Sequence, residues 1–265
     1  MIYNRRYLFC IAAVLCAVVL TASAEEFWVK RDWKQWSKDD CAKMLQDSPW
    51  TRRWAKSQIA SHQMPGVSGA NQEGASAENA PEMHYLVQLR SSLPIREAVV
   101  RLQQIQLKYD KMSAEEKKDF DTKAESLLNR SYDDVILVHV EYGSNLQSFE
   151  RELSTYWKKI PPDAPPNDLY LINERGDRIA PIKFISPQNG SYTFDLAFPR
   201  VKDKEPVVRN GDKILSIQLT HPAVGLQTQT NTTNPSGPSM DVFGEERVLI
   251  QFKLDKMAVQ GKASY

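Results

Sequence analysis

Apolar residues in the first part of the chain recur at intervals of three and four, which is the spacing of one helix face. Cys41 and Met44 lie on such a face, and Ser37 precedes it at the position of a helix cap. The stretch 51–61 predicts a second short helix. Five of the six tryptophans fall in the same region. We therefore predict a Trp-rich helical segment over residues 25–63.

A segment with the composition of a linker comes next, and regular strand and helix spacings follow it. Residues 64–82 are dominated by Gly, Ala, Ser, Asn and Pro, which bury too little apolar surface to order the chain, so a flexible linker is predicted. Residues 83–160 alternate between strand and helix spacing. We predict strands over 83–89 and 135–142 and helices over 94–109, 113–128 and 146–157. The order β-α-α-β-α is that of a small α/β unit.

A proline-rich stretch, 161–167, predicts a stiff boundary, and no helical period follows it. Short alternating runs are then separated by turn residues, and Asn-Gly between two such runs predicts a hairpin. The turns stand at Arg175-Gly176-Asp177, Asn189-Gly190 and Asn210-Gly211. Residues 167–265 are therefore predicted to form an antiparallel β-sandwich-like domain, or a partly open barrel, of about six strands.

These segments together predict an α+β fold class with three parts: a Trp-rich helical segment, a small α/β unit and a C-terminal antiparallel β-domain. Within the last part, the stretch 221–247 is longer than most loops of compact domains. Such a loop is either functional or mobile, and the pattern does not decide between the two.

The N-terminus has the features of a secretory signal. Arg5 and Arg6 precede 18 uncharged residues, which end in Ala22-Ser23-Ala24 before two acidic residues. We predict a signal peptide over residues 1–24 with cleavage after Ala24, and hence an exported protein, periplasmic or secreted. The alternative is an uncleaved anchor, since an apolar run of this length just crosses a bilayer. After cleavage, no stable membrane span is expected.

The net charge limits the partners that the chain is expected to bind, and the cysteine content limits how its fold can be stabilised. The chain has 34 Lys and Arg against 33 Asp and Glu, a net charge of +1, so no general attraction to nucleic acid is expected. Cleavage removes Cys10 and Cys16 and leaves Cys41 alone, so no internal disulfide can form. A lone thiol is either reactive or, more commonly, a small buried apolar residue.

Two groups of residues are candidates for a site. Trp33, Trp36, Trp50 and Trp54 could form a platform on which sugar rings stack, although large aromatic residues more often serve as packing anchors. His84, His139 and Glu141 lie in the two predicted strands of the α/β unit. If these strands pair in a suitable register, the three side chains could form an acid–base site, although a polar strand face is more often simply solvated.

The chemistry expected of the histidine group is limited. Metal sites usually need three or four ligands and only two histidines are present here, so no metal or other cofactor is predicted. The sequence also contains none of the usual signatures of nucleophilic hydrolases, zinc proteases or phosphate-binding loops. Whether the protein is an enzyme stays open at this point.

A W-x-x-W-[S/T]…S-P-W pattern is formed by Trp33, Trp36, Ser37 and the later Ser48-Pro49-Trp50. This pattern resembles a family of uncharacterised exported proteins of soil bacteria. The similarity extends to 91–98, 252–257 and 260–262. What the resemblance implies is export and a similar domain order, with no established activity and no catalytic residue.

From these observations we expect an exported, non-enzymatic binding or envelope-interaction protein of unknown ligand. Its partner would be an envelope protein or a glycan. The alternative is an envelope hydrolase or glycan-active enzyme with a site around His84, His139 and Glu141. The two hypotheses differ in whether the histidines and a carboxylate converge in the folded chain.

Overall fold

Strong local capping signals start two of the predicted helices. The computed structural model describes residues 26–57, 80–188, 190–227, 239–259 and 262–265. Ser37 and Ser113 each form a complete capping box. The serine hydroxyl accepts a hydrogen bond from the backbone N–H three residues on, and the acidic side chain of that residue accepts one from the serine N–H. The predicted signal peptide, 1–24, and most of the predicted linker, 64–82, lie outside the described residues.

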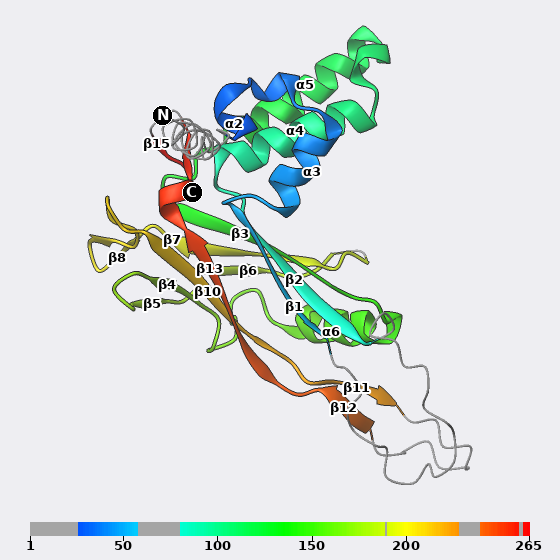
Figure 1. Ribbon diagram of the computed structural model, residues 1–265, viewed down its shortest axis with the longest axis vertical. Helices are drawn as coiled ribbons and strands as arrows, with labels where there is room; N and C mark the ends of the chain where they lie inside the picture. The colour runs from blue at the N-terminus through cyan, green and yellow to red at the C-terminus, as the bar shows by residue number, and fades with distance from the viewer. Residues whose placement is uncertain (1–25, 58–79, 189, 228–238, 260–261) are drawn as a thin grey trace, which may run out of the picture.

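The helices of the first half gather at one end of the molecule (Figure 1). The N-terminal segment contributes α2 (Phe27–Lys30), η2 (Trp33–Gln35) and α3 (Lys38–Gln46). The connection between the first two strands of the α/β unit contributes α4 (Leu93–Gln106), η4 (Tyr109–Lys111) and α5 (Ala114–Leu128). The predicted β-α-α-β-α order is thus confirmed, since α6 (Gln147–Lys159) follows the second strand.

A five-stranded antiparallel sheet runs through the middle of the molecule in the order β1-β2-β3-β7-β6. Its strands are β1 (Thr51–Ser57), β2 (Glu82–Leu89), β3 (Val135–Ser144), β7 (Thr193–Pro199) and β6 (Lys183–Ile185). The sheet therefore joins the Trp-rich segment, the α/β unit and part of the β-rich region. The strands β6 and β7 on either side of the predicted Asn189-Gly190 turn pair antiparallel, as a hairpin requires, whereas Asn189 itself lies outside the described residues.

The predicted helix over 51–61 is wrong, because residues 51–57 form strand β1. β1 pairs with β2 from Thr51 opposite Gln88 to Ser57 opposite Glu82. Arg, Ala and Lys in this stretch favour a helix weakly, and the hydrogen bonds offered by the edge of β2 outweigh that preference.

A second sheet has the order β13-β10-β4-β5. Its strands are β13 (Glu246–Lys253), β10 (Ile214–His221), β4 (Tyr170–Asn173) and β5 (Arg178–Ile179), and smaller pairs are formed by β8 (Val201–Lys202) with β9 (Glu205–Pro206), β11 (Val224–Gln227) with β12 (Ser239–Phe243), and β14 (Ala258–Val259) with β15 (Lys262–Ala263). A one-turn helix, η5 (Leu254–Lys256), follows β13. The mixed helix and strand content confirms the α+β class.

Two expectations for the β-rich region need correction. The Asn210-Gly211 turn does not close a hairpin between paired strands, because β10 takes β4 and β13 as its partners. The stretch 221–247 is also not a plain loop: it contains the paired strands β11 and β12. Within the described residues no α-helix follows α6, as predicted.

The alternation predicted for residues 83–89 places Met83, Tyr85, Val87 and Leu89 on one buried face of β2. Helix α6 covers this face: the ring of Trp157 lies 4.4 Å from that of Phe194 on β7. Cys41 is buried and free, as expected of a small apolar residue, and burial raises the pKa of its thiol to about 11. No helix among the described residues is long and apolar enough to span a bilayer.

Candidate functional site

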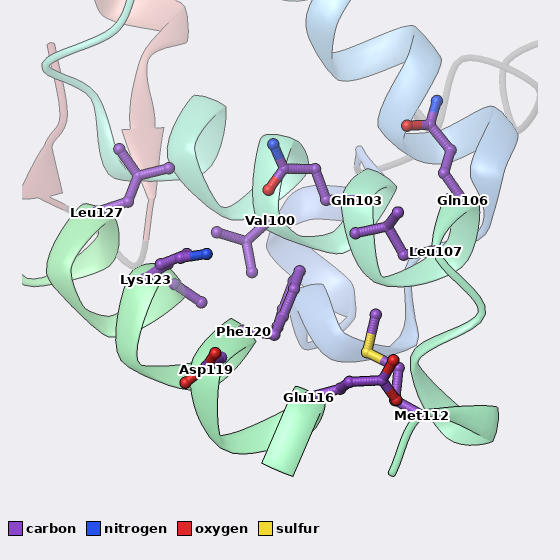
Figure 2. Close-up of a pocket in the computed structure, with 11 residues that line it drawn as sticks. Val100, Gln103, Gln106, Leu107, Met112, Glu116, Asp119, Phe120, Lys123 and Leu127 are labelled. Atoms are coloured by element: carbon purple, nitrogen blue, oxygen red, sulfur yellow. The ribbon is translucent and has the colours of Figure 1, made fainter. Parts of the chain in front are cut away.

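A groove lies between α4 and α5, two neighbouring helices joined by a short connection (Figure 2). The chain reverses at Lys108, whose positive φ of 54° ends α4, and the capping box at Ser113 then starts α5. The groove has a volume of about 670 Å³. It is lined by Val100, Gln103, Gln106, Leu107, Met112, Glu116, Asp119, Phe120, Lys123, Ala124 and Leu127.

The floor of the groove is apolar. Val100 and Phe120 are buried at its base, and the ring of Phe120 meets that of Tyr109 edge-on at 5.3 Å. Leu107 stands at the margin with 57% of its surface exposed. Met112, a flexible side chain that adapts to different shapes, lies at the same end (Figure 2). Such a floor can receive apolar side chains of another molecule.

The rim of the groove is polar. Gln103 and Gln106 come from α4, whereas Asp119 and Lys123 come from α5. Glu116 is engaged in the capping box, and its bonds to the backbone N–H and the hydroxyl of Ser113 hold the pKa of its carboxyl below the usual range. These groups can orient a ligand through amide and charge contacts, but they form no acid–base pair.

The strand histidines share a sheet face, as their predicted positions require, but they do not converge. Gln88 lies opposite His139, whereas His84 lies opposite Gly143. The two histidines are therefore separated by four residue steps along the strands, roughly 13 Å. Glu141 is exposed between them, opposite Leu86. This arrangement gives no shared acid–base site for His84 and His139.

His139 is paired instead with Asp195, a residue that the sequence pattern did not single out. Its Nδ1 lies 2.6 Å from the Asp195 carboxylate across the β3–β7 ladder. His139 is buried, while the carboxylate is partly exposed. Such a cross-strand pair satisfies a buried histidine and joins β7 to the α/β unit.

His84 occupies space that a side chain at position 143 would need. A Cβ added to Gly143 would lie 2.8 Å from His84 Cε1 and 3.6 Å from Glu150 Oε1. Burial and the charge of Arg53 lower the pKa of His84, and the nearby carboxylates do not reverse the shift. The His84 imidazole therefore packs against Gly143, a position of β3 without a side chain.

Replacing Gly143 by alanine is expected to lower the free energy of unfolding by about 1 kcal/mol, because the His84 ring must move aside. Urea unfolding measures this loss. In a His84→Ala background, Gly143→Ala should leave the free energy of unfolding unchanged. An equal cost in both backgrounds would show that the contact with His84 is not its cause.

The tryptophans divide into buried and half-buried residues. Trp36 and Trp50 are buried and therefore cannot present a ring face to a sugar, which corrects the hypothesis of a four-residue platform. Trp33 and Trp54 are half-buried and pack against the core. The rings of Trp28 and Trp50 meet edge-on at 5.8 Å, as packing anchors do.

In the part of the chain that the structure describes, no group of three or more His, Cys, Asp or Glu side chains is placed to hold a metal ion. The sequence pattern predicted the helices that line the groove, but not the groove itself, because it depends on how far apart the two helices lie. Three comparisons, with protein-family models, curated proteins and solved structures, found nothing that matches the chain.

Proposed function

We propose that the chain is an exported, non-enzymatic binding protein that holds an amphipathic helix of a partner protein in the α4–α5 groove. The observation that carries this proposal is the groove between two helices, with Val100 and Phe120 at its floor and the exposed side chain of Leu107 at its margin. Grooves of this kind receive the apolar face of a helix, with anchors at helical spacing.

The size and rim of the groove suit such an occupant. About 670 Å³ lies within the range of ligand sites and accommodates several apolar side chains. The α5 margin carries the carboxylates of Glu116 and Asp119 beside the ammonium of Lys123, and the excess of negative charge favours a basic residue at the edge of the bound helix. Gln103 and Gln106 line the groove from α4, and their exposed amides can bond to polar side chains.

Export is a separate part of the proposal and rests on the N-terminal pattern. The basic residues, the apolar run and the small residues before Ala24 support cleavage and transport. An exported chain would meet envelope proteins, so the helix is expected to belong to one of them. The resemblance to exported soil-bacterial proteins stays a prediction.

The alternative, an envelope hydrolase or glycan-active enzyme, has one specific observation in its favour, the short bond between His139 and Asp195. A carboxylate that orients a histidine is a usual part of a hydrolytic site. His84 lies roughly 13 Å away along the strands, however, and so cannot act with the pair on one bond. The groove therefore supports the binding function better.

Selection of a phage-displayed library of amphipathic helical peptides on the purified chain is expected to yield binders with apolar anchors at positions i, i+3 or i+4, and i+7. Leu107→Glu should weaken the selected peptides by about tenfold or more in fluorescence anisotropy, because a charge enters the apolar margin. Leu249→Glu is the matched control, because Leu249 is 56% exposed against 57% for Leu107 but lies on β13.

Two further variants separate the floor from the rim. Ala124→Phe fills the groove and should abolish binding, whereas Asp119→Lys should weaken peptides that carry a basic edge residue. Glu125→Lys reverses an exposed charge on α5 outside the groove and should have no effect. Failure to select any helical binder, or binders equally affected by Leu249→Glu, would contradict the proposed function.

A further inference from the structure

A second hollow, of about 430 Å³, lies at the N-terminal end of α4. Segments far apart in the sequence meet there: the start of α4, the end of α5, the residue after β7 and the last residues of the chain. The charged side chains that line it are Arg96, Arg130, Arg200 and Asp133, and the hydroxyls of Ser91 and Ser264 line it as well. This hollow is independent of the groove and of the function proposed for it.

Positive charge is in excess around the hollow, because three arginines line it against one side-chain carboxylate, that of Asp133. Arg96 donates through Nη1 to the carbonyl oxygens of Leu127 and Arg130, at 2.9 and 3.1 Å, and these acceptors are uncharged. Arg200 likewise donates to the carbonyl oxygen of Tyr132, at 2.6 Å, and through Nη2 to a backbone oxygen of Tyr265. Among the described residues, no side-chain carboxylate forms an ion pair with any arginine of the hollow.

The start of α4 adds to this excess. Ser92, its N-cap, makes no side-chain capping bond, and the first turn contains no acidic residue. By contrast, α3 and α5 both begin with acidic side chains in complete capping boxes. The N–H groups and the dipole of a helix start favour negative charge. The start of α4 instead lies beside Arg96, Arg130 and Arg200, which line the hollow.

Buried polar atoms without partners give independent evidence for a ligand. Ser91 is 5% exposed and Arg96 8% exposed, and both line the hollow. In the described part of the chain, Ser91 Oγ and Arg96 Nε have no hydrogen-bond partner. Native proteins rarely leave such groups unpaired, and an oxyanion bound beside Ser91 would supply an acceptor for its hydroxyl.

We propose that this hollow binds an oxyanion, a phosphoryl or sulfuryl group carried by a small organic molecule. The hydroxyl of Ser91 and the guanidinium of Arg130 would bind its oxygens, together with the N–H of Leu93. That N–H now makes only a long bond of 3.4 Å to Ser264 Oγ, which an anion can replace.

The size of the hollow indicates that the oxyanion is part of a larger molecule. A space of about 430 Å³ holds more than one phosphate or sulfate group. The rings of Tyr132 and Tyr265 line it, under the guanidinium groups of Arg96 at 5.1 Å and Arg200 at 5.5 Å. These rings provide small apolar surfaces for the carbon skeleton within a mostly polar lining.

Titration calorimetry of the full chain at constant ionic strength tests the proposal with four probes: inorganic phosphate, sulfate, glucose 6-phosphate and glucose. We expect glucose 6-phosphate to bind more tightly than the free anions and glucose not to bind. Tighter binding of sulfate than of phosphate would identify a sulfuryl group. Absence of binding by all three anions up to about 10 mM would overturn the proposal.

Two variants assign the binding to this hollow. Ser91→Ala removes a hydroxyl that has no partner and Arg130→Gln removes an exposed charge, so both chains should fold normally. Each should weaken glucose 6-phosphate binding by about tenfold. Arg151→Gln removes the same charge from the exposed side of α6, away from the hollow. It should change the affinity for glucose 6-phosphate less than twofold, because a distant surface charge is screened by salt. Equal weakening by Arg151→Gln, or none by the two site variants, would overturn the assignment.

Discussion

Replacing Trp50 by alanine is expected to lower the free energy of unfolding by about 3–5 kcal/mol. The side chain is fully buried, and its ring packs edge-on against that of Trp28. The indole N–H also donates to the carbonyl oxygen of Ser264, which joins the N-terminal segment to the C-terminal end of the described chain. Removing the ring leaves a cavity and an unpaired carbonyl at the same place. Urea unfolding followed by tryptophan fluorescence measures the loss.

Trp33→Ala is the matched control, because Trp33 belongs to the same segment but is only half-buried at the edge of the cluster. Trp33→Ala should lower the free energy of unfolding by less than about half as much as Trp50→Ala, since less apolar surface is lost from the core. Equal losses for both variants would contradict the role of Trp50 as the anchor. Peptide binding in the α4–α5 groove should survive Trp50→Ala under conditions in which the chain is still folded.

The elements that were predicted correctly are those specified by neighbouring residues. Ser37 with Asp40, and Ser113 with Glu116, each specify a helix start within one turn, and both capping boxes form. The alternation over 83–89 likewise specifies which side chains of β2 are buried. The turn at Gly176 follows from a single requirement, a positive φ of 84°, which glycine meets without strain.

The elements that were missed depend on partners distant in sequence. Thr51 to Ser57 becomes a strand because β2 offers it a ladder, and no residue within 51–61 signals that partner. Asn210-Gly211 turns the chain, but β10 pairs with β4 and β13 rather than with the strand before the turn. Local preference sets the turn, and long-range pairing sets the sheet.

The candidate sites follow the same division. The common face of His84, His139 and Glu141 could be predicted from strand alternation, but the partner of His139 could not. Asp195 lies 56 residues further on and reaches His139 only through the β3–β7 pairing. The α4–α5 groove and the arginine-lined hollow also arise from the packing of whole elements, for which single residues give no periodic signal.

Lowering the pH from about 7.5 to 4 is expected to destabilise the native chain by about 3 kcal/mol through His221 alone. Burial lowers the pKa of His221 to about 4, with a smaller contribution from the charge of Lys56, and Glu246 opposes the shift. The ring lies in the core, with Nδ1 3.1 Å from the hydroxyl of Tyr85 and Nε2 without a partner among the described residues. An added proton would therefore be buried without an acceptor.

The direction of this effect follows from where each state takes up the proton. The unfolded chain protonates His221 below its ordinary pKa of 6.5, whereas the folded chain does so only near 4. Stability from this group is therefore complete above 6.5 and falls by about 1.4 kcal/mol for each pH unit until the folded pKa is reached. Urea unfolding at the two pH values measures the difference.

His221→Gln isolates the contribution, because glutamine can still bond to Tyr85 but does not titrate. All other titratable groups are present in both chains, so the native chain should lose about 3 kcal/mol more than the variant on acidification. His84→Gln is the matched control: His84 is half-buried and shifted in the same direction, with a smaller expected effect. Equal acid sensitivity of the native chain and His221→Gln would show that His221 takes up its proton without cost in the folded core.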